Sequence, residues 1–157
     1  MRRRSRRPVG LLLAAAVAGG VVTGCSDPSD DYCATLTDEK GTLQRLSTEA
    51  DAPGSEALSQ SIDVFERLRD ASPEDIRDEW TTYVFAWQGL EEALDRAGVD
   101  AGVFDDGTQP EGVGDAEYDA VRDAAGKMRS QPVVDAAVGI EQHASDVCGV
   151  ALGGAGL

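Results

Sequence analysis

Apolar residues recur at helical spacing along most of the chain, and no segment alternates apolar and polar residues as a half-exposed strand would. Three apolar stripes precede residue 99, over residues 31–48, 55–71 and 72–97. Their apolar positions are Cys33, Leu36, Leu43 and Leu46, then Leu58, Ile62, Phe65 and Leu68, then Ile76, Trp80, Val84, Trp87, Leu90 and Leu94. Each stripe predicts a helix with one face in the core.

The third of these helices has a recognisable start and end. Ser72 is placed to cap free amides, Pro73 would occupy the first helical position, and acidic residues follow where the helix dipole is positive. Gly98 supplies a residue that adopts the left-handed conformation at the end. The sequence therefore predicts a long central helix over residues 72–97.

The second half of the chain predicts a loop and then one or two helices. Residues 99–115 are rich in glycine and acids and lack a period, which is typical of an exposed loop. A helix over 116–129 follows, and Pro132 leaves open whether 133–147 is a fifth helix or a kinked continuation. The expected buried positions are Tyr118, Val121, Ala125 and Met128, then Val133, Val134, Ala137, Ile140 and Val147. We expect an all-α, compact antiparallel bundle of four to five helices.

The first 24 residues have the layout of an export signal. Five arginines within residues 1–7 precede an apolar stretch, residues 9–22, of about 14 residues, whereas a helix that spans a bilayer needs about 20. The segment Ser5-Arg6-Arg7-Pro8-Val9 resembles a twin-arginine signal, so the route, general secretory or twin-arginine, stays open.

The end of this signal, Val21-Val22-Thr23-Gly24-Cys25, resembles the lipobox of bacterial lipoproteins. The resemblance implies that the Cys25 sulfur carries a diacylglyceryl group, that the chain is cut before Cys25, and that the protein is held at the outer face of the cell membrane. Two or more acyl chains suffice for stable anchoring. The alternative is an ordinary cleaved signal that ends near a cysteine.

Four parts follow along the chain: a signal peptide at 1–24, a tether at 25–30, a helical domain at 31–149 and a flexible tail at 150–157. Removal of residues 1–24 takes away five of the 14 basic residues and none of the 29 acidic ones, which leaves a formal charge of −20. Such a charge repels nucleic-acid phosphates, so nucleic acid is not an expected partner. It attracts cations or a basic partner, although solubility alone also explains it.

Two cysteines remain besides Cys25, one near each end of the domain. We expect Cys33 and Cys148 to form a disulfide, because the exterior of the cell is oxidising. The alternative, a reactive thiol or a metal ligand, lacks a neighbouring Cys or His at ligand spacing. The bundle is therefore expected to be closed by one disulfide.

Three short motifs carry a wider resemblance. Asp31-Tyr32-Cys33, Ser72-Pro73-Glu74-Asp75-Ile76 with Trp80 downstream, and the segment from His143 to Gly149 together resemble small actinobacterial lipoproteins of unknown function. The resemblance covers nearly the whole mature chain. It implies the helical fold and the disulfide, and it implies no activity.

The sequence contains no recognisable catalytic constellation. His143 is the single histidine, no nucleophile elbow accompanies it, and its spacing from Glu141 differs from the Glu-x-x-His unit of di-iron bundles, so a surface position is expected. The acidic segment 100–111, with Asp105 and Asp106, departs from the EF-hand pattern, which favours a solvated loop over a calcium site. We expect neither a cofactor nor an enzymatic activity.

Trp80 and Trp87, seven residues apart on one helical face, are able to stack a flat or sugar ligand, but core packing explains them as well or better, because their neighbours continue the apolar stripe. We therefore expect a lipid-anchored module that binds an envelope protein or a small ligand. Its candidate contact residues are Trp80, Trp87, Asp105 and Asp106. The alternatives are an envelope enzyme that depends on a carboxylate-bound metal and a purely structural envelope lipoprotein.

Overall fold

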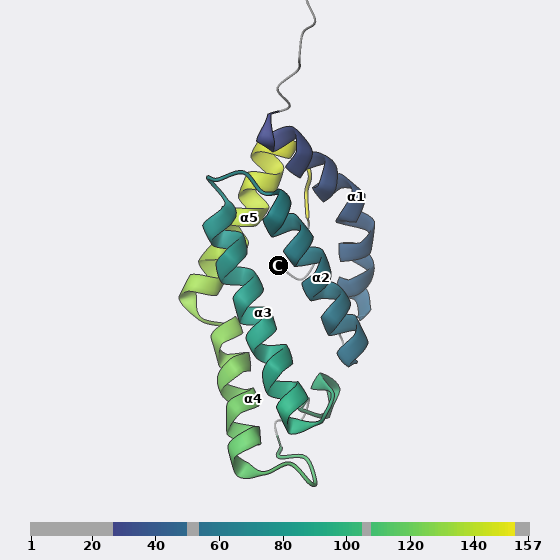
Figure 1. The fold of residues 1–157 in the computed structure, drawn as a ribbon, viewed down its shortest axis with the longest axis vertical. Helices are drawn as coiled ribbons and strands as arrows, with labels where there is room; N and C mark the ends of the chain where they lie inside the picture. The colour runs from purple at the N-terminus through teal and green to yellow at the C-terminus, as the bar shows by residue number, and fades with distance from the viewer. Residues whose placement is uncertain (1–26, 50–53, 105–107, 153–157) are drawn as a thin grey trace, which may run out of the picture.

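The amphipathic stripes fold into α-helices that pack side by side (Figure 1). The computed structural model describes residues 27–49, 54–104 and 108–152. Over these residues the elements are α1 (Pro28–Glu49), α2 (Ser55–Ala71), α3 (Arg77–Ala97), the short 3-10 helix η1 (Ala101–Phe104), α4 (Asp115–Met128) and α5 (Gln131–Cys148), and no strand occurs among them. The predicted all-α bundle is confirmed, with the last segment divided into two helices.

The helices alternate in direction along the bundle. α1, α2 and α3 run antiparallel in turn, and α4 and α5 follow one another in a common direction along α3 (Figure 1). α3 contacts α2, α4 and α5, and is therefore the central helix. The arrangement is that of an up-and-down bundle whose fourth member is broken near Ser130.

Trp80 of α3 lies at the centre of the larger of two core clusters. Its side chain is 0% exposed, and its ring lies 6.3 Å from that of Phe65 and 6.3 Å from that of Tyr83. The Trp80 indole N–H donates a hydrogen bond of 3.0 Å to the Tyr32 hydroxyl. A buried N–H without an acceptor would cost about 1–3 kcal/mol, so this bond allows the indole to be buried completely.

A smaller cluster fills the half of the bundle that holds α4. It consists of Leu58, Ile62, Ala93, Leu94, Val121 and Ala124. Trp87 packs against both clusters and so joins the two halves of the core.

The disulfide joins the first helix to the last. Cys33 in α1 and Cys148 at the end of α5 are bonded across a sequence separation of 115 residues, with their Cα atoms 5.1 Å apart. The predicted pairing is confirmed. α1 begins at Pro28 and not at Asp31, so three residues of the expected tether belong to the helix.

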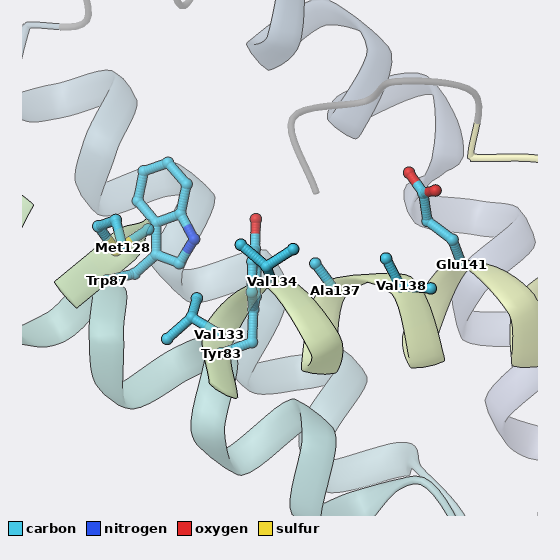
Figure 2. A pocket seen from close by; sticks show the side chains of 8 residues that line it. All are labelled: Tyr83, Trp87, Met128, Val133, Val134, Ala137, Val138 and Glu141. Carbon is cyan, nitrogen blue, oxygen red and sulfur yellow. The ribbon is translucent and has the colours of Figure 1, made fainter. Parts of the chain in front are cut away.

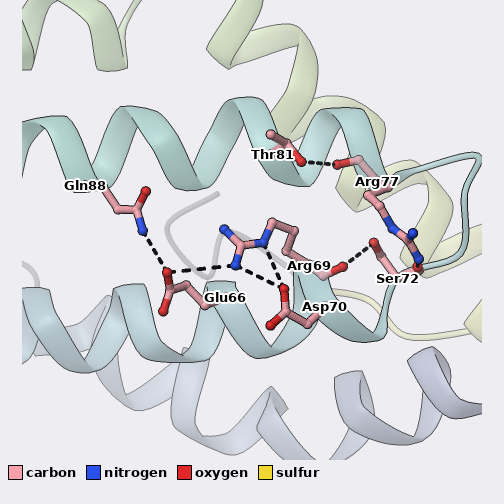
Figure 3. A network of polar contacts seen from close by, with 7 residues as sticks. All are labelled: Glu66, Arg69, Asp70, Ser72, Arg77, Thr81 and Gln88. Atoms are coloured by element: carbon pink, nitrogen blue, oxygen red, sulfur yellow. Dashed lines mark hydrogen bonds and ion pairs between the residues drawn. The ribbon is translucent and has the colours of Figure 1, made fainter.

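The start of α3 differs from its prediction. Residues 73–76 form a turn, α3 begins at Arg77, and no side chain caps it. The Ser72 hydroxyl instead donates to the Arg69 carbonyl at 2.6 Å, while the Arg77 guanidinium donates to the Ser72 carbonyl at 2.5 Å (Figure 3). Ser72 therefore closes the end of α2. Its hydroxyl bonds the Arg69 carbonyl, one turn earlier in the chain, and not a free backbone amide at the start of α3.

One side-chain hydrogen bond also joins α2 to α3, since Glu66 accepts a hydrogen bond of 2.7 Å from Gln88 of α3 (Figure 3). Within α2, Arg69 pairs with Asp70 at 3.0 Å and approaches Glu66 at 3.9 Å. Exposed ion pairs of this kind each contribute about 0–1 kcal/mol to the stability of the fold.

The buried positions of α4 and α5 are partly different from those expected. In α4 the buried alanine is Ala124 and not the expected Ala125. In α5, Val134 and Val147 are exposed, although both were expected to be buried. The buried side of α5 is formed by Val133, Ala136, Ile140 and Ala144. Small alanines bring α5 close to its neighbours, whereas sequence-based assignment favoured the larger valines.

The chain beyond α5 returns to the core. Gly149 has a φ of 64°, and the amide of Val150 donates to the Ala144 carbonyl at 2.9 Å, which is the bond pattern of a Schellman closure. Val150 and Leu152 are buried in the larger core cluster. The expectation of a flexible tail from residue 150 is therefore wrong for residues 150–152, and the rest of that tail lies outside the described residues.

Replacing both cysteines, in a Cys33→Ser, Cys148→Ser variant, should lower the free energy of unfolding by about 2–5 kcal/mol, because the unfolded chain regains the freedom of a loop of more than 100 residues. Urea denaturation followed by circular dichroism measures this change. A reducing agent should shift the midpoint of the native protein and leave that of the variant unchanged. Equal midpoints for the oxidised native protein and the variant would show that the bond does not stabilise the fold.

Candidate binding groove between α3 and α5

A groove of about 240 Å³ lies between α3 and α5, with one residue from the end of α4 (Figure 2). The residues that line it are Tyr83, Trp87, Met128, Val133, Val134, Ala137, Val138 and Glu141. Most of its wall is apolar, and Glu141 is the one carboxylate among the lining side chains. The lining thus offers apolar contact with a single charged group.

Helical spacing explains why these side chains meet. Tyr83 and Trp87 are four residues apart in α3, so their rings follow each other along one side of that helix. On α5, Val134, Val138 and Glu141 are separated by four and three residues and form a second row. Ala137 stands within that row, and its short side chain leaves space that a larger residue would fill.

The two helices also approach closely outside the groove. Gly139 of α5 lies where an added Cβ would come within 3.3 Å of Cγ of Glu79 in α3. Glu79 lines a different, shallow hollow together with Asp135 and Ala136, so this close approach is not part of the groove wall.

Tyr83 and Trp87 provide the polar groups of the groove floor. Burial raises the pKa of the Tyr83 hydroxyl well above its usual value; the neighbouring Trp87 N–H opposes this shift, and the negative charge of Glu141 adds to it. The Trp87 N–H lies near this hydroxyl and is buried, but the contact falls short of good hydrogen-bond geometry. The floor is therefore neutral at physiological pH.

The α5 side of the groove exposes apolar and acidic groups to solvent. Val134 is 45% exposed and Val138 is 57% exposed, a high fraction for two valines that lie one turn apart. No Lys or Arg occurs in the sequence of α5, and among the described residues no ion pair involves Glu141. The α5 side of the groove therefore combines two adjacent exposed valines with a carboxylate that has no ion-pair partner among the described residues.

The structure separates the contact residues that the sequence suggested. Trp87 is half-buried and lines the groove, whereas Trp80 is fully enclosed in the core and reaches no surface, so its proposed contact role is wrong. Asp105, Asp106 and Cys25 lie outside the described residues. One tryptophan of the expected pair therefore belongs to the candidate site.

His143 lies at the disulfide end of the bundle, away from the groove. Its side chain is 11% exposed, its ring meets that of Tyr32 edge-on at 5.5 Å, and its Nε2 atom is 3.5 Å from Oδ2 of Asp75. The expectation of a surface position is thus wrong, because the turn before α3 covers the ring. Within the described part of the chain, no group of three His, Cys, Asp or Glu side chains is arranged to hold a metal ion.

A second hollow, of about 400 Å³, lies between α2 and the end of α3. Its lining includes the carboxylates of Glu56, Glu91 and Asp95 around Leu58 and Leu94. Glu56 already accepts a hydrogen bond from Gln60, at 3.3 Å, and both Glu56 and Asp95 face solvent. This hollow is a solvated acidic surface, which makes the groove beside Trp87 the better candidate site.

Of the residues that line the groove, the sequence predicts only Trp87 as a contact. Met128, Val133, Val134 and Ala137 are predicted as core positions, and Tyr83, Val138 and Glu141 are not predicted as contacts. The spacing of Val134, Val138 and Glu141 is visible in the sequence, but α5 carries valine and alanine on several sides. Only the packing of Ala136, Ile140 and Ala144 against the core shows which side remains exposed.

None of the described helices combines the length and the apolar character that are needed to cross a membrane. Comparison of the chain with protein-family models, curated proteins and solved structures finds no match.

The raised pKa of Tyr83 predicts a loss of stability at alkaline pH. The unfolded chain releases this proton near pH 10.0 and the folded protein retains it, so the unfolding free energy should fall as the pH rises above 10.0, by up to about 1.4 kcal/mol per pH unit. Tyr83→Phe should make this decrease shallower in urea titrations between about pH 9 and 11. An unchanged slope would show that Tyr83 ionises equally in both states.

Proposed function

We propose that this protein is an exported, lipid-anchored interaction module that binds a partner at the groove between α3 and α5. The observation that carries the proposal is the exposed ridge of Val134 and Val138 beside half-buried Trp87. A buried aromatic anchor next to apolar residues that remain exposed to water is the usual centre of a protein-protein contact. The proposal agrees with the resemblance to small actinobacterial lipoproteins, which itself carries no activity.

The anchor is supported by the export signal, by the lipobox around Cys25 and by the position of α1. Only residues 26 and 27 separate Cys25 from the start of α1 at Pro28. Three residue steps span at most about 10 Å in an extended chain. A lipid on Cys25 would hold the first turn of α1 and the nearby disulfide close to the membrane surface, with η1 at the far end of the bundle.

Binding is favoured over catalysis by the chemistry of the groove. Its lining supplies one carboxylate, one tyrosine held neutral and apolar side chains, without a nucleophile paired to a base. The alternative of a carboxylate-bound metal rests on the acidic segment that includes Asp105 and Asp106, which lie outside the described residues. No observation within the described residues favours that alternative over binding.

The anchor is tested by intact mass spectrometry of the protein from its native membrane. We expect a mass that lacks residues 1–24 and includes acyl chains on Cys25, with two alkylated thiols only after reduction. A Cys25→Ala variant should lose the acyl mass and leave the membrane fraction, because the acyl chains on Cys25 are the anchor that the lipobox implies. An unmodified Cys25 in the native protein would contradict the proposal.

The groove is tested by placing a photo-crosslinking amino acid at Val138 in living cells. We expect one discrete crosslinked adduct. Its yield should fall by about fivefold or more in the Cys25→Ala variant, because this variant lacks the anchor that keeps the protein at a high local concentration at the membrane. Phe85 is the matched control position, since it is 62% exposed and lies two residues after Tyr83, on the opposite side of α3.

Crosslinking at Val138 that is absent, or that equals crosslinking at Phe85, would contradict the groove as the binding site. An adduct at Val138 that persists fully in the Cys25→Ala variant would separate the two parts of the proposal: the site would stand and the anchor would not contribute to it.

A further inference from the structure

We infer that the groove receives a basic amphipathic segment of a partner protein. Apolar side chains of that segment would enter the space beside Trp87 and Val138, and a Lys or Arg on the same face would pair with Glu141. The inference rests on the proposed function and adds the chemistry of the partner.

The size of the groove favours a macromolecular segment over a small molecule. Its volume of about 240 Å³ is below the range of roughly 300–1,000 Å³ that is usual for small-molecule sites, and one or two side chains fill it. The ridge of Val134 and Val138 extends the apolar contact outside the hollow itself. From Val134 to Glu141 the row spans eight residues, or about 10 Å of helix, which matches two turns of a partner helix.

The charges around the groove favour a basic segment. Glu141 is the one charged side chain among the residues that line the groove, and α5 contains no Lys or Arg. The mature chain carries a formal charge of −20, which steers cations toward this surface and repels a second copy of the protein and anionic lipids. Among the segments that could bind an apolar groove, a positively charged one is therefore attracted by the negative charge of the protein.

The charge distribution also orients the segment. Lys127 and Arg129 flank Met128, which lines the groove from the end of α4, whereas Glu141 lies two turns further along α5. One end of the groove is therefore close to basic residues and the other end is acidic. The basic residue of the partner belongs at the Glu141 end, with its apolar residues toward Met128.

Two synthetic helical peptides with the same leucine face test the inference, one with lysines one turn beyond the leucines and the other with glutamates at those positions. Their binding to the purified full chain is measured by fluorescence anisotropy. The basic peptide should bind about tenfold or more tightly than the acidic one. Glu141→Gln should lower the affinity for the basic peptide by about fivefold or more, and Val138→Ser should lower it by a similar factor.

Asp146→Asn is the matched control, because it removes one negative charge from an exposed side of α5 outside the groove lining. It should change the affinity less than about twofold. An equal effect of Asp146→Asn and Glu141→Gln would overturn the inference in favour of unspecific attraction. Equal binding of both peptides, or competition by hexylamine as strong as that by the unlabelled basic peptide, would also overturn it.

The two proposals fail differently. If the basic peptide does not bind while crosslinking at Val138 in cells persists, the interaction site stands and the basic segment is wrong. If the full chain sediments as a dimer that Val138→Ser abolishes, the occupant is a second copy and the inference is overturned. If neither crosslinking nor peptide binding occurs, both proposals fall.

Discussion

The covalent bond between α1 and α5 is the constraint on which the rest of the bundle depends. The chain has few aromatic residues to pack in its core, and its many negative charges repel one another. This repulsion opposes the compact state that the packing of the helices stabilises. The Cys33–Cys148 bond joins the two helices that are furthest apart in sequence. It also holds Tyr32, the residue before Cys33, where its hydroxyl accepts the Trp80 N–H at the centre of the larger core cluster.

The groove follows from how α5 is held at its two ends. The disulfide fixes its last residue to α1, and the turn at Ser130 starts it in a new direction after α4. Between these points, Ala136 and Ala144 bring α5 close to the core, and Val134 and Val138 are left in solvent. Trp87 contributes to both core clusters and to the groove wall, so an occupant of the groove would contact a residue on which the packing of both halves depends.

The parts of the fold that are predictable from sequence are those with large apolar side chains on one side of the helix only. Leu58, Ile62, Phe65 and Leu68 gave an unambiguous stripe for α2, and the cysteine pair followed from the number and placement of the thiols. α5 was not predictable in this way, because its valines and alanines surround the helix and the alanines are the buried ones. The role of Ser72 is not predictable either, because a serine between two helices is able to cap the next helix or to close the previous one, and the sequence context is the same.

The candidate site was predictable only in part, for a related reason. Trp87 and Trp80 share one helical face, and the difference in their burial depends on neighbours from α1 and α5 that no local spacing specifies. Glu141 and Val138 line a groove only because α5 lies beside α3. A groove is a property of two elements, whereas periodicity describes one element at a time.

The bond between α1 and α5 has a mechanical consequence for a protein held at one end and bound at a groove. Tension between an anchor at Cys25 and a partner on Val134 and Val138 would enter through the first turn of α1, cross the sulfur bridge, and pass directly into α5. Because Tyr83 and Trp87 also line the groove, a partner bound there would load α3 as well as α5. The part of the load that enters α5 would reach the anchor through the disulfide, without passing along α2.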